Sequence, residues 1–372
     1  MIYTDWFPPA YRAGGPVQSI YQLTQLLKQA FDIYVLTTTK DLNNSIEDQL
    51  PTKNDFVKVE GIQVIYLDEA NRSLAQVSRI HDTLRPDYTF FNGIFKRYFY
   101  KHLLVHLFSR SNAKTIISLR GMLRASAMQH HKMKKRLYLL AVKWLSSRKN
   151  VSFHCTTKEE EREMLVHFGK KYTRKVLPNI PFLSQDIVNL PKAEMLNIIY
   201  AARIHPIKNL HLVIRVLARV NASVKLTIVG VVEDEAYWLK CQDEIKQLPA
   251  HIHVKFLGDL NHKSLMQKLP NFDVYFLPTQ GENFGHSIFE ALSAGLPVII
   301  SDQTPWRDLN KQKLGFDIPL KNENEYVKAI EFFAQMDQGA YASYAQNAMN
   351  FARNYYEKQQ YEDNYKKLFE TP

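Results

Sequence analysis

One stretch of the sequence, residues 273–301, constrains the fold more than any other. Its apolar start at 273–277 is typical of a buried parallel strand, and a loop with two glycines follows. The helical pattern after the loop ends at Gly295 and Pro297, and a second apolar strand begins at once, at 298–301. The stretch therefore predicts a strand–loop–helix–strand unit of a parallel sheet.

The loop of this unit should carry a ligand. It leaves the carboxyl end of a strand, where open α/β sheets bind ligands, and it opens a helix whose first N–H groups favour an anion such as phosphate. Gly285 would let the backbone approach that anion closely. Glu282 and Glu290 bracket the site, and because phosphate repels carboxylates, we expect them to bind sugar hydroxyls. The pattern indicates a nucleotide sugar.

The same residues also permit a purely structural interpretation. Ser287 and Glu290 have the spacing of a capping box, and Glu282 could be an ordinary acidic residue near a helix start. Short motifs of this kind often match by chance, so the rest of the chain has to decide between the two interpretations.

Strand-like and helix-like segments alternate along the chain, which predicts α/β architecture: parallel sheets with helices on both faces. A proline-containing, aperiodic segment at 178–194 is interpreted as a linker. We therefore expect a Rossmann-like acceptor domain at 1–177 and a Rossmann-like nucleotide-sugar domain at 195–350. The remaining residues, 351–372, are expected to form a C-terminal helix that could cross back to the first domain.

Composition narrows the classes of protein that remain. No apolar run reaches the roughly 18 residues that span a bilayer, and the start of the chain does not resemble a signal peptide, so we expect a cytoplasmic location. Cys155 and Cys241 lack metal-ligand spacing, and neither a metal site nor a disulfide is expected. The formal net charge of +11 favours anionic partners without choosing among nucleic acid, anionic lipid and phosphorylated substrates.

A second candidate loop, 203–209, follows a predicted strand at 196–201 and should lie at the same sheet edge as Glu282. Arg203 and Lys208 would place two cations there, and fixed cations stabilise the charge that develops on a departing diphosphate. The alternative is a solvated basic loop. We favour the functional interpretation because the two loops share one edge.

Three weaker signals complete the set. Gly230 and Leu257 lie at strand ends where backbone groups could hold a flat base, although plain strand termination explains them equally well. Gly14 and Gly15 between the first strand and the first helix are typical of a phosphate-binding turn. The dinucleotide fingerprint G-x-G-x-x-G is absent, which disfavours a Rossmann dehydrogenase.

The motifs that carry a family resemblance occur in order along nearly the whole chain. They are Gly14-Gly15, Arg203 with Lys208, and Glu282-Asn283-Phe284-Gly285 with Glu290. With these motifs the chain resembles a retaining glycosyltransferase of family four, of bacterial surface-polysaccharide type. The resemblance implies the GT-B fold, in which two Rossmann-like doubly wound domains face an interdomain cleft.

The resemblance also implies roles. Glu290 would bind the donor ribose, and Glu282 would contact donor-sugar hydroxyls near the reacting carbon. Arg203 and Lys208 would stabilise the departing diphosphate, so no metal or other cofactor is expected. The other donor-binding residues would be Gly14, Gly15, Gly230, Leu257, Asn283, Phe284, Gly285, His286 and Ser287. The expected reaction moves a sugar, with retention, from a nucleotide-diphosphate sugar, a UDP-sugar being favoured, to a saccharide or lipid-linked acceptor.

One position departs from the family pattern. Many relatives carry His-Gly where this chain has Arg120-Gly121. Arginine cannot act as a base, but it can bind a sugar oxygen or a phosphate. We therefore count Arg120 among the catalytic candidates and assign no general base.

The basic segment 124–150 has two interpretations. It joins a cluster of lysines to an apolar helix that contains Trp144, as in a helix that contacts an anionic membrane surface, which would make the protein peripheral at the inner face of the plasma membrane. It could equally be a core helix with a solvated basic end.

Two other functions remain open: a sugar-nucleotide epimerase of the same fold, and a non-catalytic protein that binds anions or nucleic acid. We expect no nucleic-acid partner, because the sharpest motifs indicate a small diphosphate ligand.

Overall fold

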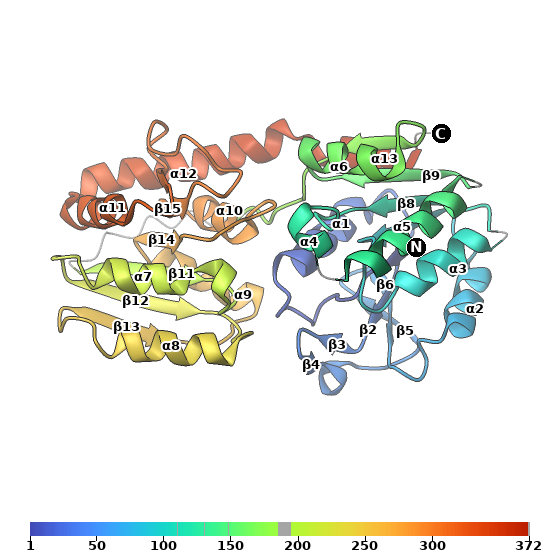
Figure 1. Ribbon diagram of the computed structural model, residues 1–372, viewed down its shortest axis with the longest axis horizontal. Coiled ribbons are helices and arrows are strands. Elements are labelled where there is room, and N and C mark those ends of the chain that lie inside the picture. Colours follow the sequence, from blue (N-terminus) through green and yellow to red (C-terminus); the bar gives the residue numbers. More distant parts are fainter. Residues whose placement is uncertain (110, 130, 148, 185–194, 371–372) are drawn as a thin grey trace. The chain divides into compact units, whose positions relative to one another are not determined.

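The computed structural model describes residues 1–109, 111–129, 131–147, 149–184 and 195–370. The chain divides into two compact units, and each is considered by itself (Figure 1). The first unit comprises Met1–Ile180 with Gln359–Pro372, and the second comprises Pro181–Lys358. Most of the predicted linker, 185–194, lies outside the described residues.

The second unit extends further than the sequence boundary at 350. Helix α12 (Gln338–Lys358) continues through that position without a break. Its small buried residues Ala345 and Ala348 let it pack closely on α10 (His286–Ser293), which keeps 351–358 in the second unit. Only α13 (Tyr361–Glu370) joins the first unit, where the Tyr365 hydroxyl donates to the Pro178 carbonyl at 3.0 Å.

Within the described residues, the first unit is built on an eight-stranded sheet in the order β10-β9-β8-β7-β1-β2-β6-β5. The strands are β1 (Ile2–Tyr3), β2 (Tyr34–Thr38), β5 (Phe56–Val59), β6 (Ile62–Leu67), β7 (Tyr88–Asn92), β8 (Lys114–Ser118), β9 (Val151–Cys155) and β10 (Thr173–Val176). Every neighbouring pair is parallel except β5 with β6. A short hairpin, β3 (Lys40–Asp41) with β4 (Asn44–Ser45), lies apart from the sheet.

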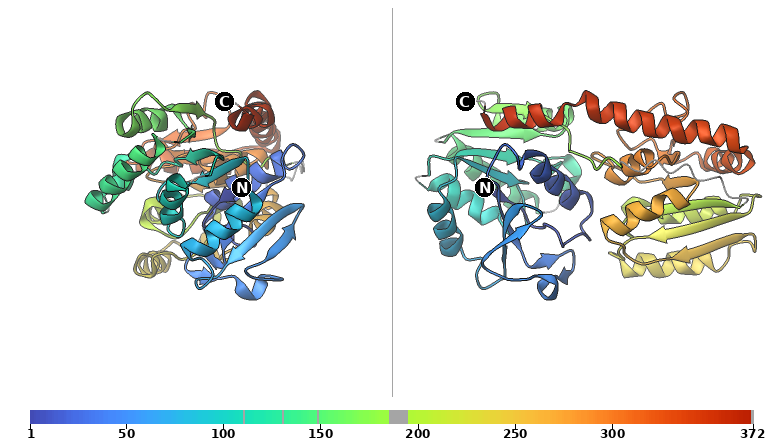
Figure 2. Two further views of the ribbon diagram at one scale, coloured as in Figure 1. Left: turned by 90° about the vertical axis from the view of Figure 1, so that its right-hand side faces the viewer. Right: turned by 180° about the vertical axis from the view of Figure 1, so that it is seen from behind.

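Helices cover this sheet (Figure 2). They are α1 (Gly15–Leu27), α2 (Leu74–Leu84), α3 (Tyr100–Phe108), α4 (Ala125–Gln129), α5 (Lys132–Ser146) and α6 (Lys158–Phe168), together with α13 and a single 3-10 turn at Glu47–Gln49. Strands β8 and β9 are buried along their whole length, as expected for central strands of a parallel sheet with helices on both faces.

The second unit carries a six-stranded, fully parallel sheet among its described residues, in the order β13-β12-β11-β14-β15-β16. The strands are β11 (Leu196–Ala201), β12 (Val224–Val229), β13 (Ile252–Phe256), β14 (Val274–Leu277), β15 (Val298–Ser301) and β16 (Gly315–Ile318). The helices are α7 (Leu210–Leu217), α8 (Glu235–Ile245), α9 (His262–Lys268), α10, α11 (Glu323–Gln335) and α12, with 3-10 turns at Pro206–Lys208 and Leu269–Asn271. This is the strand order of a doubly wound Rossmann sheet.

The predicted strand–loop–helix–strand unit is present as β14, α10 and β15, with β14 and β15 paired in parallel. The sequence analysis missed three edge strands, β5, β10 and β16, because edge strands are short and their apolar patterns are weak. The antiparallel β5 also departs from the expectation of purely parallel sheets. Among the described helices, none is long and apolar enough to cross a bilayer.

Acid should destabilise the first unit selectively. Burial lowers the pKa of both His106 and His154 to about 3, against an ordinary value of 6.5. Both are therefore neutral when folded, and the stability they contribute is complete above pH 6.5 and is lost as the pH falls from there toward 3. In that range, each histidine should lower the free energy of unfolding by up to about 1.4 kcal/mol for every pH unit of acidification.

Each unit contains one buried cysteine among its described residues, Cys155 in the first and Cys241 in the second, so thiol labelling reports their unfolding separately. With a disulfide reagent that reacts at acid pH, the urea midpoint for Cys155 should fall much more steeply between pH 6.5 and 4.5 than the midpoint for Cys241. If the urea midpoints for the two thiols fell equally with pH, the prediction would be wrong.

Candidate active site

The candidate site of the second unit lies where its strand order reverses, between β11 and β14. Open α/β sheets bind ligands outside the carboxyl ends of the strands at such a reversal. The loop after β11 contains Arg203 and Lys208, and the loop after β14 contains Glu282. The topology thus brings together two loops that are about 75 residues apart in the sequence.

The two loops are joined by a network of hydrogen bonds. The backbone N–H of Gln280 donates to the carbonyl of Ile207 at 2.8 Å, and the hydroxyl of Thr279 donates to the same carbonyl at 3.1 Å. The side-chain amide of Asn209 donates to the carbonyl of Pro278 at 3.1 Å. The loops therefore hold each other in place in the absence of ligand.

Lys208 and Glu282 form an ion pair across these loops, with Nζ and Oε1 2.5 Å apart. Both side chains are largely buried, with 16% and 13% of their surface exposed. A buried ion pair is strongly destabilised when one partner is removed, because the other charge is then left desolvated. The ion pair fixes the positions of both charged groups. From the sequence, Lys208 was predicted to contact the diphosphate of the donor, and Glu282 the hydroxyls of its sugar.

Arg203 has a partner that the sequence analysis missed. Its guanidinium donates to Glu233, with Nη1 and Oε2 2.5 Å apart. Glu233 belongs to the loop after β12, the next strand of the sheet, so Arg203 is oriented from a third loop at the same edge. The sequence around Glu233 does not predict this contact, because the contact depends on which strands are neighbours in the sheet.

Glu290 also has an unpredicted partner. The residue lies inside α10 and is only 4% exposed, and its Oε1 accepts a hydrogen bond from Nε2 of His262 at 3.0 Å. His262, the first residue of α9, packs edge-on against the ring of Phe182, with centroids 4.9 Å apart. The histidine therefore orients the Glu290 carboxylate from a neighbouring helix.

The start of α10 has the geometry expected of a phosphate-binding turn. Gly285 precedes the helix with φ +80°, a conformation that disfavours a side chain. The Ser287 hydroxyl is hydrogen-bonded to the hydroxyl of the buried Tyr275, with the two oxygens 2.7 Å apart, which fixes its position. His286 lies beside Phe284, with ring centroids 4.8 Å apart. Asn283 falls in the same turn.

Phe284, another residue predicted to bind the donor, has its side chain in the core of the unit. Its ring is buried and packs against Trp306, Phe289 and Tyr355. The side chain anchors the loop in the core of the unit, so that only the backbone of Phe284 remains to meet a ligand.

The backbone structure explains why position 230 is a glycine. Its φ is +150°, and a Cβ at this position would lie 1.9 Å from the carbonyl oxygen of Ala202. The residue permits the close approach of the loops after β12 and β11. Leu257 lies at the end of β13 and donates its N–H to the Ile228 carbonyl at 3.0 Å. Both residues are at the expected sheet edge, and neither shows a distinct ligand-binding feature.

In the first unit, Gly14 and Gly15 mark the start of α1. Gly14 precedes the helix with φ +67°, and Gly15 is its first residue. The loop before them is ordered by Asp41, whose carboxylate accepts the N–H groups of Tyr11 and Arg12 at 2.8 and 3.0 Å. The loop is therefore held by a side chain that the sequence analysis did not single out.

Arg120 follows β8 with φ +53°. Its guanidinium donates to Asn92 Oδ1 and Ser19 Oγ, both at 2.8 Å, and to Asn179 Oδ1. Burial lowers the pKa of the group, and these hydrogen-bond acceptors are neutral. A partly buried cation that donates to neutral acceptors is well suited to an anionic or hydroxyl-rich ligand and cannot accept a proton.

A cluster missed by the sequence analysis lies at the strand reversal of the first unit, between β1 and β7. Asp5 and Lys96 are 2% and 5% exposed, and the Lys96 ammonium lies 5.5 Å from the ring centre of Trp6. The Asp5 carboxylate accepts the N–H groups of Arg97 and Tyr98 at 3.0 and 3.2 Å. Burial raises the pKa of Asp5 and lowers that of Lys96. The cluster could have been predicted from the sequence, because Lys96 follows shortly after a buried strand.

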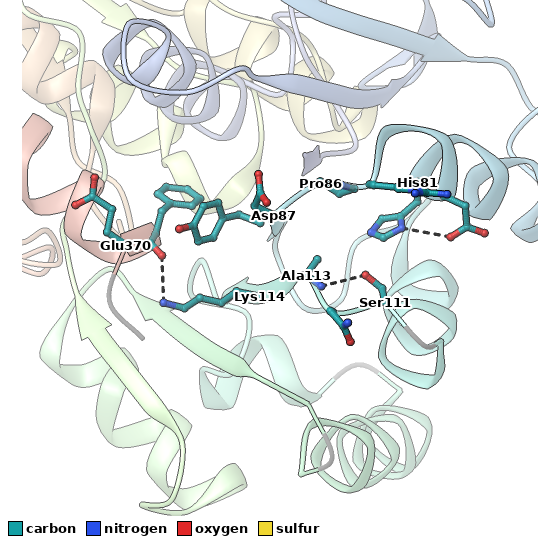
Figure 3. A pocket seen from close by; sticks show the side chains of 12 residues that line it. His81, Pro86, Asp87, Ser111, Ala113, Lys114 and Glu370 are labelled. Atoms are coloured by element: carbon teal, nitrogen blue, oxygen red, sulfur yellow. Dashed lines mark hydrogen bonds and ion pairs between the residues drawn. The ribbon is translucent and has the colours of Figure 1, made fainter.

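A pocket of about 710 Å³ in the first unit lies at the opposite edge of the sheet (Figure 3). Its lining includes Asp87, directly before β7, and Lys114, the first residue of β8, so it opens at amino ends of strands. The Lys114 ammonium donates to the Phe369 carbonyl at 3.2 Å. This position does not match the ligand-binding edge of an open α/β sheet. Among the described residues, no cluster of three or more His, Cys, Asp or Glu could hold a metal ion.

The two glycines Gly230 and Gly281 provide a matched test of how the site is held. Gly230→Ala should lower the free energy of unfolding of the second unit by about 3 kcal/mol, because its Cβ would overlap the Ala202 carbonyl. Gly281→Ala should change it by less than about 0.5 kcal/mol, since a Cβ there has no atom within 4 Å. Urea denaturation followed by Cys241 labelling measures both, and similar losses in the two variants would refute the prediction.

The chain is similar to known proteins in both sequence and fold. Residues 185–351 match the family described as "Glycosyl transferases group 1". The chain is 23% identical over 219 residues to the GtfA subunit of a UDP-N-acetylglucosamine–peptide N-acetylglucosaminyltransferase from Streptococcus gordonii. That match covers 55% of this chain and 42% of the relative, so the chain spans less than half the length of the curated protein it matches.

Solved structures match over the whole chain. Sucrose-phosphate synthase from Thermosynechococcus elongatus superposes with a TM-score of 0.73 at 17% identity, covering 100% of this chain and 99% of that one. Anabaena HepE, solved with UDP and glucose, gives 0.72 at 17% identity, with the same coverage. WaaG, a glycosyltransferase of lipopolysaccharide biosynthesis, gives 0.69 at 13% identity, again with 100% and 99% coverage. The chain therefore has the GT-B fold of two Rossmann-like units, and most of its second unit is similar to the glycosyl transferases group 1 family.

Proposed function

We propose that this protein transfers a sugar from a nucleotide-diphosphate sugar to a saccharide or lipid-linked acceptor, with retention of configuration and without a metal ion. The observation that carries the proposal is the Lys208–Glu282 ion pair at the strand reversal of a group 1 domain, with Glu290 held by His262 in the following helix. A cation for phosphate and two fixed carboxylates for hydroxyls are the groups that a nucleotide sugar requires.

On this proposal Glu290 binds the ribose of the donor. One of its oxygens is already engaged by His262, so the carboxylate cannot rotate and presents its other oxygen in a fixed direction. The glycine turn at Gly285 and the first N–H groups of α10 take the phosphate or the distal part of the donor. Gly14, Gly15, Gly230, Leu257, Asn283, Phe284, His286 and Ser287 stay predicted donor contacts, and Arg120 stays a catalytic candidate.

The leaving group would be stabilised by Arg203 and Lys208. Negative charge grows on the diphosphate as the bond to the sugar breaks, and cations that are already oriented stabilise it without reorganisation. Glu233 and Glu282 orient these two cations before the donor arrives. Glu282 then contacts the hydroxyls of the donor sugar. We assign no general base.

The names of the relatives support a UDP-sugar as the donor. HepE has been solved with UDP-glucose, and the curated relative is named for UDP-N-acetylglucosamine. Their names describe different acceptors: WaaG takes part in lipopolysaccharide biosynthesis, and the curated relative acts on peptide. For this chain we propose surface polysaccharide assembly, as a cytoplasmic protein peripheral at the inner face of the plasma membrane.

Donor binding can be tested by thermal shift against UDP-, GDP- and ADP-sugars and the bare nucleotides. A donor at one hundred times its dissociation constant should stabilise the wild type by about 2.7 kcal/mol. Glu290→Gln removes the charge that accepts the ribose hydroxyls, so it should weaken binding of both the sugar nucleotide and the bare nucleotide, while Glu325→Gln on the exposed face of α11 should not. No response of well-folded protein to any nucleotide would count against the proposal.

Transfer can be tested with the donor that binds, using glucosides and a cell-envelope lipid extract as acceptors. Glu282→Gln and Arg203→Gln should each lower kcat by about a hundredfold or more, the size expected when a group that stabilises the transition state is lost. The wild-type rate should persist in EDTA. Conversion of the donor sugar to an epimer without transfer would establish the alternative enzyme, and binding with neither reaction would establish a non-catalytic protein.

A further inference from the structure

Helix α5 of the first unit exposes an unusual row of large apolar side chains. Met133, Leu137, Leu140 and Trp144 are 74%, 65%, 62% and 53% exposed. Their spacing of four, three and four residues places them along one face of the helix. The opposite face carries Leu139, Val142 and Leu145, which are buried in the core of the unit. The helix is therefore apolar on the side that faces away from the protein as well as on the side that packs.

A neighbouring helix, α3, widens this apolar area. The Tyr138 hydroxyl of α5 donates to the Tyr100 carbonyl of α3 at 3.0 Å, and the two rings lie 6.0 Å apart. Tyr100 is 40% exposed, and Phe108, at the end of the same helix, is 75% exposed. We refer to these side chains and the row on α5 together as the α5 surface. In Figures 1 and 2, α5 lies on the outside of the first unit.

The segment of the chain that contains the α5 surface has only positive formal charges. Residues 88–158 contain fifteen Lys and Arg and no Asp or Glu. The segment therefore carries a formal charge of +15, whereas the whole chain carries +11, so the rest of the chain carries −4. The net charge of the protein is thus concentrated in the segment that contains α3 and α5.

Folding does not account for this arrangement. The exposed cations Lys132, Lys134 and Arg136 all lie in the first turns of α5, where the helix dipole disfavours positive charge. Lys132 and Arg136 are four residues apart, which adds repulsion between like charges. Large apolar side chains beside them are exposed at a further cost. An anionic partner with an apolar interior would offset the unfavourable helix dipole, the repulsion between like charges and the exposure of the apolar side chains.

We propose that the α5 surface docks on an anionic phospholipid bilayer. The row from Met133 to Trp144 runs along the helix, so a helix lying in the plane of the membrane would bury all four side chains at the boundary of headgroups and acyl chains. The lysines and Arg136 would reach lipid phosphates, and Trp144 suits the interfacial region. This inference goes beyond the proposed transfer reaction, and it can be tested with no sugar nucleotide present.

The test is co-sedimentation of the full chain with vesicles of phosphatidylcholine alone or mixed with phosphatidylglycerol. Binding should require the anionic lipid and weaken as salt is raised. Each cation near an anionic surface contributes about fivefold to the partition coefficient (about 1 kcal/mol). The partition coefficient of the triple variant Lys132→Gln/Lys134→Gln/Arg136→Gln should therefore be about a hundredfold lower than that of the wild type. The matched control, Lys225→Gln/Lys240→Gln/Lys255→Gln, removes three exposed cations of the second unit and should bind as the wild type does.

A second pair of variants tests insertion of the apolar row. Leu137→Gln/Leu140→Gln should lower the partition coefficient about tenfold or more, because both side chains would leave the lipid for water. Val166→Gln/Leu239→Gln replaces two apolar residues that are 81% and 60% exposed elsewhere and serves as the control. These positions are exposed, so the variants should fold, which near-ultraviolet circular dichroism would verify.

Depth of insertion gives an independent readout. Brominated acyl chains should quench the tryptophan fluorescence of the wild type on anionic vesicles, and the quenching should largely disappear in Trp144→Phe, which keeps Trp6, Trp238 and Trp306. Adsorption by charge alone would produce binding without this quenching and would overturn insertion. Equal binding to neutral and anionic vesicles, or binding to neither, would overturn the proposal.

Two further outcomes would also overturn it. If Leu137→Gln/Leu140→Gln converted a dimer into a monomer in analytical ultracentrifugation, the α5 surface would be an interface between copies of this chain. If the controls lost binding as much as the test variants, the effect would not belong to α5. Because the variants lie outside the donor site, their donor-dependent thermal shift should equal that of the wild type, which keeps a failure here separate from a failure of the proposed reaction.

Discussion

The candidate site of the second unit depends on the pairing of β11 with β14, the neighbouring strands between which the strand order reverses. Strand pairing fixes where the two loops leave the sheet, and hydrogen bonds from Thr279, Gln280 and Asn209 then join them. The Lys208–Glu282 ion pair completes this connection. Because the loops are held before a ligand arrives, little conformational entropy has to be lost on binding, which is the physical basis of a preorganised site.

The carboxylates of this site are fixed by partners from other elements. Glu282 is held by a lysine from the loop after β11, and Glu290 by His262 of α9. Glu233 orients Arg203 in the same way. A cation and a carboxylate that neutralise each other can remain largely buried at a sheet edge, whereas either alone would be strongly destabilised there. The arrangement gives each of these charged side chains a partner at the candidate site.

The two units use the same topology with different chemistry. At its own strand reversal the first unit places Asp5 and Lys96, and beyond β8 it places Arg120 among neutral acceptors. The first unit also contains the acid-free segment 88–158, while the rest of the chain is slightly acidic in sum. The charged groups at the candidate site of the second unit are thus a few paired side chains, whereas the positive charge of the first unit is spread along a long segment.

The sequence by itself determined the features that depend on neighbours along the chain. Apolar runs such as Val274–Leu277 and the stop at Gly295 gave the parallel-sheet class and the central unit, and the spacing of Glu282 and Glu290 marked the site. Only the tertiary structure decided which distant groups meet. Glu233 and His262 lie on loops or helices that strand order brings together, Phe284 is drawn into the core by Trp306, and the row on α5 is exposed because the other face of that helix packs. Local pattern fixes periodicity and turns, whereas partners and exposure depend on packing between segments far apart in the chain.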